Sequence, residues 1–186
     1  MYLGRIGYYL DFFVYPLLII CLATAGIAEG GARGLVKWAA LFAAAFILWT
    51  LIEYLLHRFG LHHIPYIKEM HDYHHSDEKA LVGTPLWLSL IGHLGACFLP
   101  VWLVFGFPAA SAASCGLMLG YLWYIGVHHA VHHWHPRHGS YLYGLKRRHA
   151  LHHHFDDTVN FGVSSNFWDV IFGTLLAARE PKKNAP

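Results

Sequence analysis

Histidine is the residue type in this sequence that most clearly suggests chemistry. The chain of 186 residues holds 17 histidines. The first is His57, and all except His93 lie in short tracts. Neutral imidazole is the commonest nitrogen ligand of zinc, iron, copper and nickel in proteins. The clustering therefore predicts a transition-metal site.

The spacings within these tracts decide which imidazoles can meet. HxxxxH separates His57 from His62, an interval that turns by about 140° on a regular helix, so both can bind one metal only if the helix ends near Gly60. HxxHH places three imidazoles on one helical face, and HxxxH places two. These spacings occur at His71, His74 and His75; at His149, His152 and His153; and at His128 and His132 or, one residue later, His129 and His133.

The number of clustered imidazoles bears on the kind of site. A single tract is often only a solvated surface that binds metal by accident, but two tracts here repeat the same triple. About ten imidazoles are too many for one tetrahedral zinc. They suit two metals with about five nitrogen ligands each, which leaves open coordination positions.

Apolar segments must position these tracts. The composition is 56% hydrophobic and only 13% charged, against about 25% charged in soluble domains. Four apolar stretches approach the ~20 residues that a membrane-spanning helix needs, and they cover residues 8–28, 35–56, 85–107 and 109–127. The last two are separated only by Gly106-Phe107-Pro108, which predicts a tight turn between antiparallel helices. We expect an all-α membrane protein, a single domain over residues 1–186, with four transmembrane helices and a helical cap that holds the histidines.

The basic residues predict the orientation in the membrane, because cytoplasmic segments carry an excess of lysine and arginine. With four crossings, Arg33 and Lys37 face one side. The other eleven basic residues share the opposite side, and they are Arg5, Arg58, Lys68, Lys79, Arg137, Lys146, Arg147, Arg148, Arg179, Lys182 and Lys183. Both termini and the histidine cap are therefore expected in the cytoplasm. An alternative is a signal peptide cleaved near Ala23-Thr24-Ala25, which leaves the histidines on the same side.

Several other classes of protein are disfavoured. A formal net charge of +2 argues against a nucleic-acid partner. Cys21, Cys97 and Cys115 lie in apolar runs without paired spacing, so neither a disulfide framework nor a thiolate site is indicated. A membrane haem protein or metal transporter would place its ligands at mid-membrane depth, where only His93 is expected. A zinc hydrolase would need a base beside an open zinc, as in HExxH, which is missing from the sequence.

The order HxxxxH, HxxHH, HxxxH, HxxHH resembles the fatty acid hydroxylase superfamily of integral-membrane di-metal enzymes, which includes sterol desaturases. Three stretches are more specifically similar to the catalytic domain of fatty acid 2-hydroxylases: GSYLYGLK at 139–146, HALHH at 149–153 and FGVSSNFWD at 161–169. Enzymes of that kind act on the acyl chains of sphingolipids. The resemblance covers about residues 45–176.

The resemblance implies ten metal ligands, which are His57, His62, His71, His74, His75, His128, His132, His149, His152 and His153. The non-ligands are then His63, His93, His129, His133, His135, His138 and His154, with His93 expected to be a core histidine whose N–H is satisfied. Two positions depart from the family pattern. Ile125 stands where an acidic residue is frequent and His129 where an aromatic one is. The register one residue later therefore stays open, although the interval to Gly139 favours His128 and His132.

The implied activity is O2-dependent hydroxylation of a lipid acyl chain, at the 2-position of a fatty acyl or ceramide-type lipid. The alternative is a sterol or carotenoid hydroxylase or desaturase. The implied cofactors are two iron ions, for which zinc can substitute in purified protein, with O2 as co-substrate. No haem domain or GxGxxG fingerprint is visible, so we expect a separate electron donor, either a b-type cytochrome or a ferredoxin with its reductase. The expected location is the bacterial inner membrane or the endoplasmic reticulum.

Three other polar residues are candidates for supporting the ligands. Glu53 lies one helical turn before His57, and a carboxylate there can accept a hydrogen bond from a ligand imidazole. A carboxylate at a helix end is the equally good alternative. Asp157 and Asn160 follow the last tract closely, although Asp-Asp-x-x-Asn is also a common turn sequence.

Overall fold

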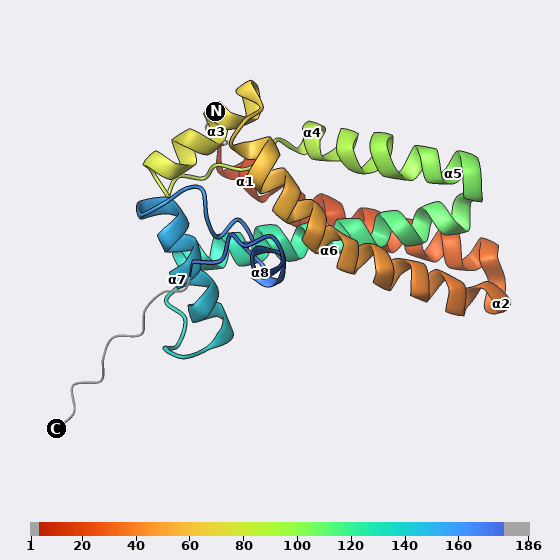
Figure 1. Cartoon of the computed structure of the whole chain (residues 1–186). Coiled ribbons are helices and arrows are strands. Elements are labelled where there is room, and N and C mark those ends of the chain that lie inside the picture. The colour runs from red at the N-terminus through yellow and green to blue at the C-terminus, as the bar shows by residue number, and fades with distance from the viewer. Residues whose placement is uncertain (1–3, 177–186) are drawn as a thin grey trace.

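Every regular element within residues 4–176, the part of the chain that this computed structural model describes, is a helix. Two long antiparallel helical pairs extend to one end of the molecule, and short helices, two of which carry histidine tracts, gather at the other (Figure 1). Arg179, Lys182 and Lys183, three of the basic residues used to predict the orientation, lie outside the described residues, as do both ends of the predicted domain.

The first helical pair is contained within one assigned helix. After the short α1 (Arg5–Tyr9), α2 runs over Asp11–Leu55 but is interrupted at Gly31, with φ 62° and ψ −178°. Only glycine adopts this conformation readily. On a straight helix Tyr15 and Trp49 would be about 51 Å apart, yet their rings lie 5.1 and 5.6 Å from the His93 ring. The chain therefore reverses direction at Gly31.

The second pair is formed by α4 (Leu86–Leu90), η2 (Ile91–Phe98) and α5 (Leu99–Phe105), followed by α6 (Phe107–His133). Gly106, at φ 84° and ψ 169°, joins the two members. Pro108 follows in the first turn of α6, where the absence of an N–H costs no helical hydrogen bond. This confirms the turn predicted from Gly106-Phe107-Pro108.

Among residues 4–176, three helical segments are long and apolar enough to cross a membrane: Arg5–Leu61 with 57 residues, Leu86–Phe105 with 20 and Phe107–His133 with 27. The first includes both halves of α2 and therefore covers the first two of the four predicted apolar stretches. Helix α2 packs chiefly on α6.

Glycines on α6 allow this packing. A Cβ atom on Gly116 would lie 2.3 Å from the Phe42 carbonyl oxygen, and one on Gly120 would lie 2.4 Å from the Cβ of Trp49. Small residues of this kind let helical backbones approach closely in apolar surroundings. The resulting contact fixes the end of α6 that carries His128 and His132 against the end of α2.

The cap consists of α3 (Pro65–Ser76), α7 (Tyr141–His154), α8 (Phe167–Ile171) and the segments that join them. Pro65 begins α3 at a position where proline is favoured. Ser140 is the N-cap of α7, and its hydroxyl accepts a hydrogen bond from the Tyr143 N–H at 3.2 Å. These signals set where both histidine-bearing helices start.

Candidate metal centre

His57 lies on a π-helix, η1, which extends α2 over Leu56–Leu61, and His62 is the C-cap of this helix. Hydrogen bonds in a π-helix join residues five apart, so residues with HxxxxH spacing stand about one turn apart. The rings of His57 and His62 are accordingly stacked, with centroids 5.3 Å apart. The helix does end near Gly60, as expected, but the pair is aligned by the π-helical turn that precedes this end.

The two HxxHH tracts each divide their histidines between two sites. On α3, His71 and His75 contribute to one group of rings and His74 to another. On α7 the division is reversed, with His149 and His153 in the second group and His152 in the first. The three imidazoles do share one helical face, as predicted, but the residues four apart turn to one side and the middle residue to the other.

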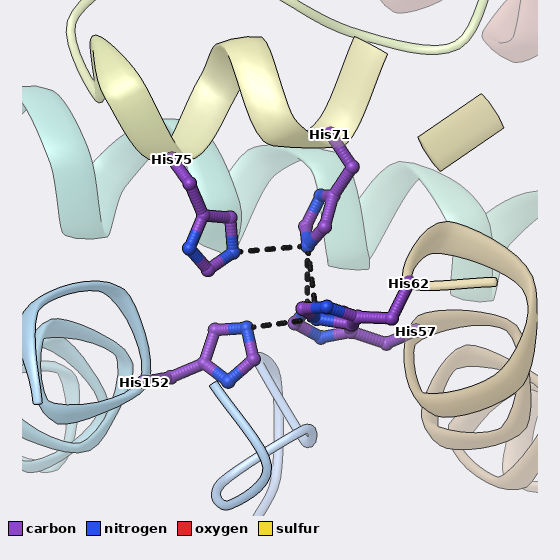
Figure 2. A group of neighbouring side chains, drawn as sticks. All are labelled: His57, His62, His71, His75 and His152. Carbon is purple, nitrogen blue, oxygen red and sulfur yellow. Dashed lines mark hydrogen bonds between the residues drawn. The ribbon is translucent and has the colours of Figure 1, made fainter. Parts of the chain in front are cut away.

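The ten histidines with implied ligand roles form two groups of five, and in each group every ring contributes one nitrogen that lies within 4.8 Å of the others. The first group comes from η1, α3 and α7 (Figure 2) and contains His57, His62, His71, His75 and His152. The second comes from α3, α6 and α7 and contains His74, His128, His132, His149 and His153.

The nitrogens converge in a way that suits cations better than hydrogen bonds. The Nε2 atom of His71 lies 3.0–3.2 Å from the Nε2 atoms of His57, His62 and His75. The Nε2 atom of His132 lies 2.9–3.1 Å from those of three further rings. One ring nitrogen carries at most one hydrogen, so these sets cannot all be hydrogen-bonded. Metal–nitrogen bonds of ~2.0–2.1 Å place neighbouring ligand nitrogens about 3 Å apart, so the donor set fits a metal in each group.

Backbone carbonyls orient two rings of the first group. The Nδ1 atom of His57 lies 2.6 Å from the Phe161 carbonyl oxygen, and that of His152 lies 2.8 Å from the Val159 carbonyl oxygen. If each Nδ1 donates its hydrogen to the carbonyl, each Nε2 carries a free lone pair, which is the tautomer that binds metal.

Two buried carboxylates hold the loop that supplies the Phe161 carbonyl. Glu53 accepts hydrogen bonds from the N–H groups of Val163 and Ser164 at 2.9 and 2.7 Å. Asp169 accepts from the N–H groups of Phe161 and Gly162, each at 2.9 Å. Glu53 thus acts on His57 through the loop rather than by touching the ring.

The other two supporting candidates have different places. Asn160 is 1% exposed, and its side chain donates to the Arg148 and Leu176 carbonyls at 3.3 and 3.1 Å. It thereby ties the loop after α7 to the end of the described chain. Asp157 is exposed. Burial lowers the pKa of His62 and His75, and the charge of Asp157 partly opposes this effect.

Burial keeps the cap imidazoles neutral. Burial first, and then the neighbouring imidazoles, lower the pKa of His74 and His75 to about 4 and that of His152 to about 3. The same causes lower the pKa values of His71, His149 and His153. A histidine must be neutral to bind a metal, so these rings are in the binding form near pH 7.

The remaining histidines lie outside both groups. His129 Nδ1 lies 3.0 Å from the Tyr8 hydroxyl, and its ring faces His133 at 4.5 Å. His93 is buried in η2, with Nδ1 2.9 Å from the Ser89 carbonyl oxygen and 3.2 Å from the Tyr15 hydroxyl. The geometry therefore favours the register with His128 and His132. The rest of this set is His63, His135, His138 and His154.

Sequence reasoning missed two carboxylates. Glu78 Oε2 lies 3.6 Å from His132 Nδ1 and 3.3 Å from His154 Nε2, and no spacing signal marks it in the sequence. Asp169 ends the stretch FGVSSNFWD, so the resemblance included it without revealing that it holds the loop beside His57.

The fold and the site together define an all-helical protein with apolar membrane-type helices and two buried five-histidine groups at one end. The profile of the fatty acid hydroxylase family matches residues 42–174. The chain therefore belongs to the fatty acid hydroxylase family.

Individual relatives agree with this membership. A fatty acid 2-hydroxylase of Macaca fascicularis is 36% identical over 148 residues, which cover 73% of this chain and 39% of that protein. A dihydroceramide fatty acyl 2-hydroxylase of Arabidopsis thaliana is 33% identical over 151 residues, 73% of this chain and 60% of that protein. This chain thus spans well under two thirds of the Macaca fascicularis protein.

A solved structure is similar over most of the chain. It is described as full-length Scs7p with only the hydroxylase domain visible, and it matches with a TM-score of 0.79 and 25% identity. The match covers 92% of this chain and 67% of the other. The arrangement of helices described above is therefore shared with a hydroxylase domain.

Proposed function

We propose that this chain hydroxylates a lipid acyl chain at its 2-position, in a fatty acyl or ceramide-type lipid, using O2 and two bound iron ions. The observation that carries the proposal is that two five-histidine groups border one pocket, through His71, His74 and His128. The ten histidines of the two groups would hold the metals. Attack on an unactivated C–H bond requires activated O2, and no side chain can activate O2. Two bound iron ions would supply this chemistry.

The residues around the groups prepare the site before any substrate arrives. Buried neutral imidazoles present lone pairs, and the Phe161 and Val159 carbonyls fix the rings of His57 and His152. Glu53 and Asp169 fix the loop in turn. Supports of this kind keep ligands in position and raise their basicity.

The reaction needs an outside source of electrons. Hydroxylation of R–H consumes O2, two electrons and two protons and gives R–OH and water. We therefore include in the proposal a separate donor protein, either a b-type cytochrome or a ferredoxin with its reductase.

The proposal also places the site relative to the membrane. The halves of α2 on either side of Gly31, the run from α4 to α5, and α6 would make four crossings, with the histidine cap in the cytoplasm. A lipid would then keep its tail in the hydrocarbon while its first acyl carbons reach the histidines. Reporter fusions at Pro186 and within residues 29–34 should report opposite compartments, and the same compartment for both would refute four crossings.

The activity can be tested with the purified chain, loaded with ferrous iron and supplied with a chemical or protein reductant and ¹⁸O2. Mass spectrometry should find one labelled oxygen on carbon 2 of an N-acyl lipid, and none with His74→Ala. Loss of two hydrogens without labelled oxygen would indicate a desaturase instead. No labelled product from any acyl lipid, with both sites loaded, would overturn the proposal.

A further inference from the structure

A pocket borders both histidine groups, and most of the residues that line it belong to neither group. Besides His71, His74 and His128, it is lined from the start of α2, from residues 82–84 and from α6. Much of this lining is apolar, as at Phe12 and Ile125. An apolar chain can therefore lie in it with one end beside the histidines.

Asp11 is the carboxylate in this lining, and its side chain is incompletely satisfied. The residue is only 4% exposed, and the Tyr121 hydroxyl donates a hydrogen bond to its Oδ2. Its Oδ1 is buried and has no hydrogen-bond partner among the described residues. The Ser89 hydroxyl lies close enough to affect Asp11, but a hydroxyl has one hydrogen to donate, and that of Ser89 is directed to the Leu86 carbonyl at 3.0 Å.

A buried carboxylate oxygen without a partner is expected to accept a hydrogen bond from a bound molecule. Buried polar atoms are nearly always hydrogen-bonded, and an ionisable residue on an apolar helix of a membrane protein usually has a function. Histidines of both groups border the same pocket, so a molecule that bonds to Asp11 also lies beside the proposed metal sites.

The carboxylate is held in a fixed direction. Tyr121, which donates to Asp11, is 4% exposed. Its ring packs edge-on against Tyr15 at 5.0 Å and against Trp49 at 5.5 Å. Because these rings restrain Tyr121, Oδ1 presents a hydrogen-bond acceptor at a set position rather than a mobile charge.

We infer that Asp11 Oδ1 accepts a hydrogen bond from an N–H or O–H group of the lipid substrate and thereby selects lipids that carry such a donor. This inference rests on the proposed acyl-chain hydroxylation. In an N-acyl lipid only the carbonyl carbon lies between the amide nitrogen and carbon 2, so a bond to the N–H also positions carbon 2. A free fatty acid at neutral pH offers no N–H or O–H donor.

Binding of lipids to the purified full-length chain tests this selection without any turnover. The probes are an N-acyl sphingoid base, its N-methylated amide, its O-methylated analogue and the free fatty acid of the same acyl chain. We expect the unmodified N-acyl lipid to bind about ten-fold more tightly than the free acid and than at least one methylated analogue, as for one hydrogen bond to a buried acceptor. The methylated analogue that loses affinity identifies the donor as the amide or the hydroxyl.

The variant Asp11→Leu keeps a side chain of similar shape and removes both acceptor oxygens. It should reduce the differences among the four lipids to about two-fold or less, whereas Glu69→Gln, at an exposed carboxylate on α3, should preserve them. If the wild-type chain binds all four lipids equally, or Asp11→Leu discriminates like the wild type, the inference is wrong. The wild-type comparison decides alone if the variant does not fold.

The two ideas fail in different ways. Selective binding without hydroxylation of any lipid by the metal-loaded chain would overturn the proposed function. Hydroxylation with equal binding of all four lipids would overturn only the role of Asp11.

Discussion

The two histidine groups contain the same residue type in the same number, but they are held differently. In the first group, loop carbonyls bond to the outer nitrogens of His57 and His152. In the second, the Nδ1 atoms of His74 and His149 have no partner among the described residues, and His132 Nδ1 has only Glu78 at 3.6 Å.

This difference indicates how each site depends on the rest of the chain. The first group needs the loop around Phe161, which Glu53 and Asp169 hold from two helices far apart in sequence. The second group depends mainly on helical spacing, because all five of its histidines lie within the helices α3, α6 and α7. The first site should therefore be sensitive to distant substitutions and the second chiefly to its own residues.

The largest effect is expected within the second group itself. His128→Ala removes a ring nitrogen that lies 3.0 Å from His74 Nε2, so it should abolish hydroxylation and lower the metal content. His129→Ala and His133→Ala should keep the metal and lose at most roughly 10- to 100-fold in activity. A 2-hydroxy-lipid assay with metal counted on the same membranes would show this. An active His128→Ala beside an inactive, metal-depleted His129→Ala would shift the register by one residue.

A distant substitution should weaken the first site alone. Asp169→Asn replaces an acceptor oxygen by an NH2 group that faces backbone N–H donors, so the loop loses a support. We expect metal affinity of the first group to fall roughly 10- to 100-fold while the second is unchanged. Stepwise titration of the metal-free chain would resolve the two sites. Equal weakening of both would mean that Asp169 supports the whole cap rather than His57.

Glu53→Gln disturbs the other support of the same loop and should have the same selectivity with a smaller effect. Glutamine keeps one acceptor oxygen for the N–H groups of Val163 and Ser164, so part of the anchoring survives. The same titration measures it, with Glu69→Gln as the control on an exposed surface. A loss confined to the second group would contradict the pathway through the loop.

The smallest change is expected at the outer partner of the second group. Glu78 is 36% exposed and 3.6 Å from His132, so water can replace much of its effect. Glu78→Ala should therefore change metal affinity only a few-fold, and His135→Ala and His138→Ala, both exposed, should change nothing measurable. A loss in Glu78→Ala as large as that in Asp169→Asn would show that the second group also depends on an outer carboxylate.

Sequence patterns predicted the features that repeat along one helix. Hydrophobic stretches and the Gly106 turn indicated the helical pairs, and HxxHH indicated rings on one face of α3 and α7. The spacing at His57 and His62 did not reveal a π-helix, because the choice between helix types depends on packing around the end of α2. The division of each triple between two groups likewise depends on how α3 and α7 face each other.

Residues that act across long separations were harder to predict. Asp169 and Glu53 meet at one loop although 115 positions separate them in the sequence, and neither touches a ligand ring. Asp11 lies in an apolar stretch without any motif, and only the folded chain brings it to the pocket with His71. Such contacts follow from tertiary packing, and no local spacing pattern in the sequence indicates them.

The central claim is that each five-histidine group holds one metal ion. It is tested most directly by elemental analysis of chain purified without oxygen and with its concentration measured by amino-acid analysis. We predict a ratio of two metal ions per chain, as iron or as zinc that has replaced it. A reproducible ratio of one or less would contradict the dinuclear site.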